Sequence, residues 1–372
     1  MSTGTISAGR PERAVLSRQE GLKRAAQHSL FGVVPVVATL ALIAFQFTIH
    51  AVAVDFHVAY WPAAARLLHG FSPYAVTRQQ ITGGTAFVYP VLSAEVFAPL
   101  AVLPRNIAEV LYMGLCIACV PATLRVLDVR DWRLYGVSLL WLPVFVGWQS
   151  GNVTLPLMLL IALVWRHRQR PLVAGVLTAV AISLKPFVWP LGLWLLATRR
   201  WKAAGWALIL GAVINALAWA LVGYSQINAY VHLSSEVTDA LWRGGYSLLA
   251  VAHHLGLSRG TGEAVLAAVS AVVAGLVVWV GACRRREGDA LALSVVLMLL
   301  ASPLLWSHYY SLLLIPVALR RPRLSLVWAL PLLMWPIPPR QPVFGWEELL
   351  AWAVTGVVLF TVLRAPRARV AA

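Results

Sequence analysis

Residues 31–61 read FGVVPVVATLALIAFQFTIHAVAVDFHVAYW, a long apolar run followed directly by a carboxylate. The apolar part, residues 31–53, is long enough to cross a bilayer as a helix. Asp55 is the first ionisable acidic side chain after it and precedes a short amphipathic stretch. An ionisable side chain at a membrane face costs free energy and usually has a function. Asp55 is therefore the first candidate functional residue of the chain.

Composition places the chain among polytopic membrane proteins. Of its 372 residues, 60% are hydrophobic and only 12% are charged, which is far more apolar than a soluble domain requires. The first apolar run follows polar, basic sequence without a small-residue cleavage site, so it predicts an anchor rather than a signal peptide. The net charge of +16 is dispersed in short clusters between apolar runs, which argues against nucleic-acid binding.

Those basic clusters predict the topology through the positive-inside rule. They hold 23 of the 30 lysines and arginines and lie at residues 10–24, 125–133, 166–170, 199–202, 284–286, 320–323 and 364–369. With all of them in the cytoplasm, both termini lie inside and about twelve spans are expected. The spans are at residues 31–53, 107–125, 134–147, 153–165, 171–184, 186–198, 203–222, 263–282, 289–304, 308–319, 323–338 and 346–363. The apolar stretch 87–103 then makes no net crossing.

We therefore expect an all-α, polytopic integral membrane helix bundle with external interfacial helices. Residues 29–364 form a single transmembrane domain between a disordered cytoplasmic tail at 1–28 and a cytoplasmic tail at 365–372. Residues 61–68 have apolar side chains at helical spacing and predict a helix in the interface plane. Residues 224–245 form a second long external segment.

This topology brings unusual polar residues from distant loops to the outer face. They are Asp55, the turn containing Gln149 and Asn152, Lys185, Arg243 and the run Trp306-Ser-His308-Tyr309-Tyr310. Their convergence was not used in placing the basic clusters. It predicts one polar cavity open to the outside.

The order of motifs along this face resembles that of the family-87 glycosyltransferases, integral membrane enzymes of the GT-C type. These include polyprenyl-phosphomannose-dependent α-1,2-mannosyltransferases of actinobacteria. The motifs are Asp55-Phe-His57-Val-Ala-Tyr60, Gly70-x-x-Pro73-Tyr74, Phe87-x-Tyr89-Pro90, Gly147-x-Gln149-x-x-Asn152, Lys185-Pro186, Tyr246-Ser247-Leu248 and Ser302-Pro303-x-x-Trp306-x-His308. The chain departs from the pattern after Tyr89, where it has one proline and many relatives have two.

The resemblance implies a GT-C-like catalytic domain in a bacterial plasma membrane, with its active site facing outside. It implies inverting transfer of a single sugar, with mannose favoured, from a polyprenyl-phosphate donor to a glycolipid or glycan hydroxyl. Membrane lipids surround the enzyme and no nucleic acid takes part. A single displacement requires one carboxylate as general base, a role that suits Asp55.

The resemblance also implies roles for the other polar residues. His308 assists catalysis, and Lys185 and Arg243 bind the donor phosphate. Residues expected to contact the acceptor or the sugar are His57, Tyr60, Trp61, Tyr89, Gln149, Asn152 and Trp306. No cofactor or metal is expected, because the chain has no Asp-x-Asp pair and its three cysteines suggest no zinc site.

Alternatives stay open at this stage. Asp55 could cap the helix that follows it, and Lys185 could extend from a helix end to the interface. Two other classes also fit a polytopic chain: a transporter or flippase of glycans or lipids, and a lipid-linked glycan polymerase or ligase. A transporter would place its polar residues near the midplane, whereas the residues singled out here favour the outer face.

Overall fold

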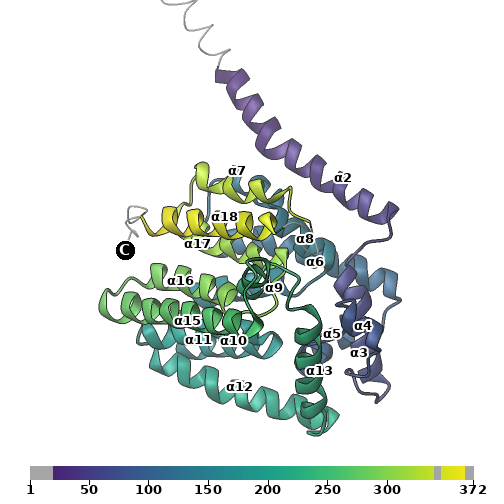
Figure 1. Cartoon of the computed structure of the whole chain (residues 1–372). Coiled ribbons are helices and arrows are strands. Elements are labelled where there is room, and N and C mark those ends of the chain that lie inside the picture. The colour runs from purple at the N-terminus through teal and green to yellow at the C-terminus, as the bar shows by residue number, and fades with distance from the viewer. Residues whose placement is uncertain (1–19, 339–344, 365–372) are drawn as a thin grey trace, which may run out of the picture.

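The computed structural model describes residues 20–338 and 345–364, and every regular element in those ranges is a helix (Figure 1). The predicted all-α class is therefore confirmed for the described chain. The helical class follows from the lipid environment, because in hydrocarbon the backbone N–H and C=O groups must form their hydrogen bonds within the segment that crosses.

Five of the described helices are long and apolar enough to cross a membrane. They are Glu20–Thr48, which includes η1 (Ser29–Val33) and α2 (Val34–Thr48), α6 (Arg105–Val126), α12 (Trp201–Val222), Arg259–Cys283, which joins α15 (Arg259–Val278) to η4 (Trp279–Cys283), and α18 (Trp346–Leu363). A sixth span is possible if α8 (Leu142–Ser150) and α9 (Thr154–Arg166), which meet at a 115° bend, act together. Helix length alone therefore does not confirm twelve spans.

The other described helices are shorter. They are η2 (Phe56–Tyr60), α3 (Trp61–Leu68), α4 (Arg78–Thr82), α5 (Val91–Ala101), α7 (Arg133–Leu139), α10 (Pro171–Leu184), η3 (Pro186–Val188), α11 (Pro190–Ala197), α13 (Gln226–Leu241), α14 (Leu248–His254), α16 (Glu287–Leu300), η5 (Ser307–Leu313), α17 (Leu314–Arg320), η6 (Leu326–Trp328) and η7 (Leu330–Met334). Several coincide with predicted spans that are too short to cross a ~30 Å hydrocarbon core unaided.

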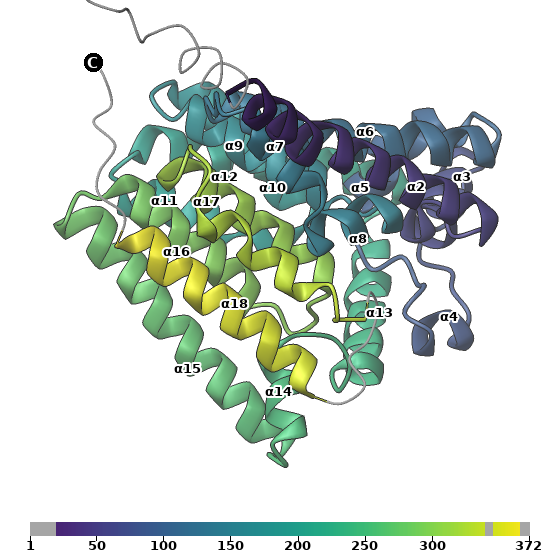
Figure 2. The same ribbon diagram turned by 90° about the horizontal axis from the view of Figure 1, so that it is seen from above.

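The core of the bundle lies around α16. Every residue of this helix from Asp289 to Leu300 is buried, and α11, α15, α17 and α18 pack around it. In contrast, α12 packs mainly along α10 and exposes most of its length, including Leu208 and Leu221. Figure 2 shows α15 along one edge of the bundle and α18 on the side that faces the viewer. Such apolar outer faces are expected where a helix meets lipid.

Four of the predicted basic clusters meet at one end of the bundle. Arg168 after α9 and Arg200 before α12 both pair with Glu287 at the start of α16, at N–O distances of 3.3 and 2.8 Å. Asp289 of the same helix pairs with Arg320 at the end of α17, at 3.2 Å, and with Arg286 of the cluster 284–286, at 2.7 Å. The grouping of these clusters, inferred from charge alone, agrees with their positions in the fold.

One expectation about local structure was wrong, and the structure adds detail to two others. Residues 20–28 belong to the first long helix rather than to a disordered tail; residues 1–19 and 365–372 of the expected tails lie outside the described ranges. Much of the external segment 224–245 is helix α13. The predicted helix at 61–68 is present as α3, and its Ala63 and Ala64 are buried where it packs on α5. Their small side chains allow this close packing, which periodicity alone did not reveal.

Candidate active site

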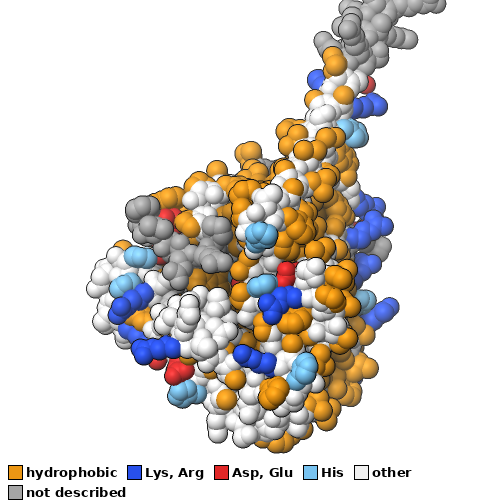
Figure 3. All heavy atoms as spheres, turned by 90° about the vertical axis from the view of Figure 1, so that its right-hand side faces the viewer, with side chains coloured by type: hydrophobic (Ala, Val, Ile, Leu, Met, Phe, Trp, Pro, Cys, Tyr) orange, Lys and Arg blue, Asp and Glu red, His pale blue; other side chains and the backbone are white. Residues whose placement is uncertain are grey.

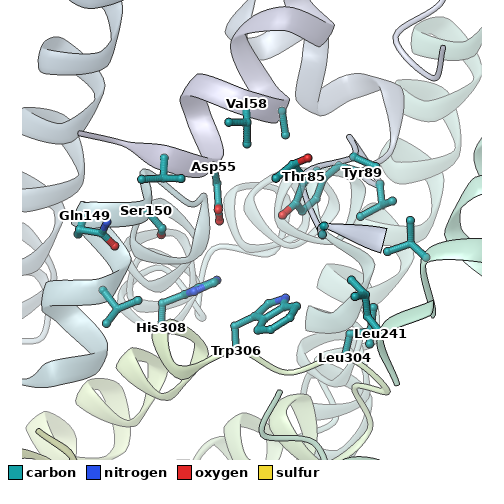
Figure 4. Close-up of a pocket in the computed structure, with 18 of the residues that line it drawn as sticks. Asp55, Val58, Thr85, Tyr89, Gln149, Ser150, Leu241, Leu304, Trp306 and His308 are labelled. Carbon is teal, nitrogen blue, oxygen red and sulfur yellow. The ribbon is translucent and has the colours of Figure 1, made fainter. Parts of the chain in front are cut away.

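A cavity of about 800 Å³ lies where the turn after α2 meets the ends of α8 and η5. Its walls come from residues 51–59, 82–89, 146–150 and 304–308, with Val237 and Leu241 of α13. In Figure 4 the side chains of Asp55 and His308 point toward one another across it. The end of the molecule that carries α3, α4 and α13 has a mixed surface, with charged and histidine side chains among other polar atoms (Figure 3). Of the residues predicted to converge, Asp55, Gln149, Trp306 and His308 line this cavity.

Asp55 lies just before η2, where the chain turns back from α2. Its side chain makes no capping hydrogen bond to that helix, so the structure does not support a role as a helix cap. Close to Asp55 lies the turn between α8 and α9. It depends on Gly151, which has a positive φ of 61° and closes the end of α8. A Cβ at Gly151 would lie 2.8 Å from the Cβ of Ala53. Only glycine lets the α8–α9 turn approach the segment of Asp55 this closely.

Asn152 joins Asp55 to a buried cation. Its Nδ2 donates to Oδ2 of Asp55 at 2.9 Å and lies 3.2 Å from the hydroxyl of Tyr89. Its Oδ1 accepts a hydrogen bond from Nζ of Lys185 at 3.0 Å. The same oxygen accepts bonds from the backbone N–H and hydroxyl of Thr154. All polar atoms of the amide are therefore used, and its orientation is fixed.

Lys185 lies at the break between α10 and η3 and is only 5% exposed. Its Nζ is 4.0 Å from the centre of the Tyr309 ring and 5.3 Å from that of Tyr89. Burial lowers the pKa of Lys185 to about 7, although the carboxylate of Asp55 acts in the opposite direction. The alternative interpretation required the side chain to extend to the interface, and the structure shows that it does not. It is enclosed behind the cavity wall.

Two stacked tyrosines lie beside Asp55, one in the wall of the cavity and one behind it. Tyr89 lines the cavity, and burial raises the pKa of its hydroxyl above the usual range, so this hydroxyl stays neutral. Tyr60 stacks on Tyr89 with ring centroids 4.6 Å apart and is fully buried. Tyr89 can therefore contact a bound molecule, whereas Tyr60 supports it from behind.

His308, Trp306 and Gln149 line the remainder of the polar wall. His308 is 3% exposed, and its Nε2 is buried without a hydrogen-bond partner among the described residues. Such an atom is costly unless a ligand satisfies it. Gln149 is held in place because its Nε2 donates to the backbone oxygen of Ala51 at 3.2 Å. Trp306 and His308 come from one segment and Gln149 from another, and all three face one space.

The structure does not bring the other three predicted residues into the cavity. His57 bonds Glu109 at 2.5 Å through Nδ1. Trp61 lies under the guanidinium of Arg105, 4.4 Å from its ring centre. Arg243 is exposed after α13, near the ring of Trp242. Contact of any of them with substrate stays a prediction.

Sequence reasoning missed part of the cavity wall. Residues 82–86, of sequence Thr-Gly-Gly-Thr-Ala, line it, as do Ser150 and Leu304. In the sequence, the paired glycines 83 and 84 could have indicated this part of the wall. In the structure, Gly84 has a positive φ of 67° and packs close to Leu241 of α13. Among the described residues there is no group of three or more His, Cys, Asp or Glu side chains that could hold a metal ion.

The fold is thus a helical bundle with membrane-spanning helices, and in its cavity one carboxylate faces one imidazole. The chain belongs to glycosyltransferase family 87, whose sequence model matches residues 87–303. It is thus a glycosyltransferase.

Two curated relatives are similar over most of the chain. One, from Mycolicibacterium smegmatis, is 26% identical over 359 residues, covering 88% of this chain and 80% of the relative. The other, from Mycobacterium tuberculosis, is 24% identical and covers 82% of this chain and 71% of the relative. Both are named polyprenol-phosphate-mannose-dependent alpha-(1-2)-phosphatidylinositol pentamannoside mannosyltransferase. No solved structure matches the chain.

Proposed function

We propose that the protein transfers one mannosyl residue, with inversion, from a polyprenyl-phosphate donor to a hydroxyl of a glycolipid at the outer face of the plasma membrane. The named relatives support the donor and the kind of acceptor. The observation that carries the mechanism is the carboxylate of Asp55, which lines the cavity and is held by Asn152.

The reaction requires one bond to form and one to break at the anomeric carbon. The acceptor hydroxyl oxygen attacks this carbon while its proton passes to Asp55 as general base. The bond from the anomeric carbon to the phosphate oxygen breaks, and polyprenyl phosphate leaves with the electron pair. An inverting displacement needs no nucleophilic carboxylate beside the base. A single carboxylate in the cavity lining suits this chemistry.

The leaving phosphate gains negative charge and needs a hydrogen-bond donor aimed at it. His308 has an otherwise unsatisfied ring nitrogen on the opposite side of the cavity from Asp55. We assign it to the donor phosphate. Trp306 beside it offers a flat apolar face for the sugar ring. Arg243 lies outside the cavity lining, so it would meet only a donor that extends beyond the cavity.

The direction of α9 and α10 is our support for an outward-facing site. α9 begins beside the Asn152 turn and ends at Arg166, and α10 runs back from residue 171 to Lys185. The cavity and the basic clusters thus lie at opposite ends of these helices. If the basic end is cytoplasmic, as the positive-inside rule requires, the cavity opens outside.

Sugar transfer by the purified protein tests this function. The protein in detergent is incubated with polyprenyl-phosphate mannose, glucose or arabinose and a phosphatidylinositol mannoside acceptor. We expect addition of one hexose, from the mannose donor, without any membrane gradient. Transfer of a preassembled chain would indicate a polymerase or ligase instead. No transfer from any donor by well-folded protein would overturn the proposal.

A further inference from the structure

We infer that Lys185 does not bind the donor phosphate but acts on Asp55 through the amide of Asn152. Lys185 would then be a positioning residue, which keeps the general base ionised and correctly oriented. This inference rests on the proposed role of Asp55. It replaces the expectation that Lys185 is a phosphate ligand.

The first support is the position of Lys185. The side chain is buried and does not belong to the lining of the cavity. Asn152 lies between it and Asp55, with contacts of 3.0 Å on one side and 2.9 Å on the other. The ring of Tyr309 covers the ammonium at 4.0 Å. A phosphate in the cavity would have to displace these groups to reach Nζ.

The second support is the chemistry of the amide. A lysine ammonium has donors and no acceptor, so only Oδ1 of Asn152 can face it. The backbone N–H of Thr154 imposes the same choice on that oxygen, at 3.2 Å. Nδ2 must therefore point to Asp55. Lys185 and Thr154 together decide which end of the amide the carboxylate meets, and the amide dipole carries the influence of the lysine to Oδ2.

The consequence for Asp55 concerns its ionisation. A carboxylate in a mostly apolar pocket tends to be protonated, whereas donors and a nearby cation favour the charged form. At acidic pH Lys185 is protonated, given its pKa of about 7. Loss of Lys185 should therefore raise the pKa of Asp55. Since a general base must be unprotonated, the acidic limb of the pH–rate profile should move to higher pH.

Other titratable groups also lie near Asp55. They are Tyr60 of η2, Tyr89 before α5, and His308 and Tyr309 of η5. Tyrosine hydroxyls ordinarily titrate near pH 10, outside the relevant range. Besides Lys185 itself, His308 is the remaining titratable group close to Asp55. A substitution at Asn152 tests the Lys185 side of Asp55 rather than the His308 side, because Asn152 forms the hydrogen bond with Asp55.

The experiment compares Lys185→Met, Asn152→Asp and the exposed-site control Lys202→Met by the pH dependence of kcat/KM and by the donor KM. Lys202 is exposed at the start of α12. We expect Lys185→Met to move the acidic limb up by about one pH unit, with donor KM changed less than about threefold. Asn152→Asp keeps the shape of the side chain and adds a like charge, so it should move the limb the same way. Lys202→Met should match wild type.

A rise in donor KM of about tenfold or more in Lys185→Met, with an unmoved pH profile, would overturn the inference and make Lys185 a phosphate ligand. If Lys185→Met does not fold, Asn152→Asp decides by the same profile: an unmoved limb overturns the inference. Asp55→Asn is measured in parallel. Its inactivity together with an unmoved limb would refute only the role of Lys185, whereas its full activity would refute the general base itself.

Discussion

Nδ2 of Asn152 donates a 2.9 Å hydrogen bond to Oδ2 of Asp55, joining two residues that are 97 positions apart in the chain. The contact connects the turn between α8 and α9 to the segment after α2. Both segments line one cavity. The position of the proposed base is therefore set by a second segment as well as by its own helix.

Replacing Gly151 with alanine should disturb this position. The residue has φ of 61°, and an added Cβ would approach Ala53 to 2.8 Å. A left-handed non-glycine residue costs roughly 1–2 kcal/mol, and the clash adds to it. We expect a lower unfolding temperature in detergent and reduced transfer. Gly114→Ala in α6 is the control, since a Cβ added there would meet nothing within 4 Å; equal behaviour of the two variants would show that the close approach is unimportant.

Replacing His308 with glutamine should lower turnover. The imidazole is assigned to the leaving phosphate, and loss of one such donor typically reduces kcat by about 10²–10³. Radiolabelled mannose transfer at saturating donor measures this effect. His232→Gln, at a histidine whose side chain is 77% exposed on α13, serves as the control. Unchanged kcat in His308→Gln would remove His308 from the mechanism.

Labelling with an impermeant thiol reagent tests the topology. Cys283 is exposed near the basic cluster 284–286, and Gln79 is exposed on α4 near the cavity. In intact cells we expect Gln79→Cys to be labelled, in a Cys283→Ser background. The native Cys283 should react only after the cells are permeabilised. The reverse pattern would place the cavity on the cytoplasmic face.

Removal of divalent metal should leave transfer unchanged. The expectation comes from the sequence, which has no Asp-x-Asp pair of the kind that holds a metal with a nucleotide sugar. The measurement is mannose transfer with a chelator present. Activity lost to the chelator and restored by manganese would contradict a metal-independent mechanism.

Much of the fold was predictable because the solvent constrains it. Apolar runs separated by basic clusters gave α6, α12 and α18 close to their observed bounds. The span count was less accessible, since α10 and α11 are short and separated only by Lys185 and η3. Whether such helices cross depends on packing, which hydropathy does not encode. The first helix also begins earlier than expected, at Glu20.

The site was predictable in part for a related reason. Topology alone grouped Asp55, Gln149 and His308, and these residues do line one cavity. It could not separate lining residues from supporting ones. The burial of Lys185 behind Asn152 is set by tertiary packing around the break after α10. Distance along the chain is also a poor guide: His57 lies two residues from Asp55, yet it bonds Glu109 and does not line the cavity.

Transfer by Asp55→Asn is the most direct test of the account. Asparagine keeps the shape of the side chain and removes the basic oxygen, and general-base assistance is typically worth ~10²–10⁴ in rate. Radiolabelled mannose transfer by folded, purified protein should therefore fall by at least about a hundredfold, with donor binding largely retained. Asp239→Asn, at an exposed carboxylate on α13, should stay near wild type. If Asp55→Asn keeps more than about a tenth of wild-type turnover, well above the expected general-base loss, Asp55 is not the general base.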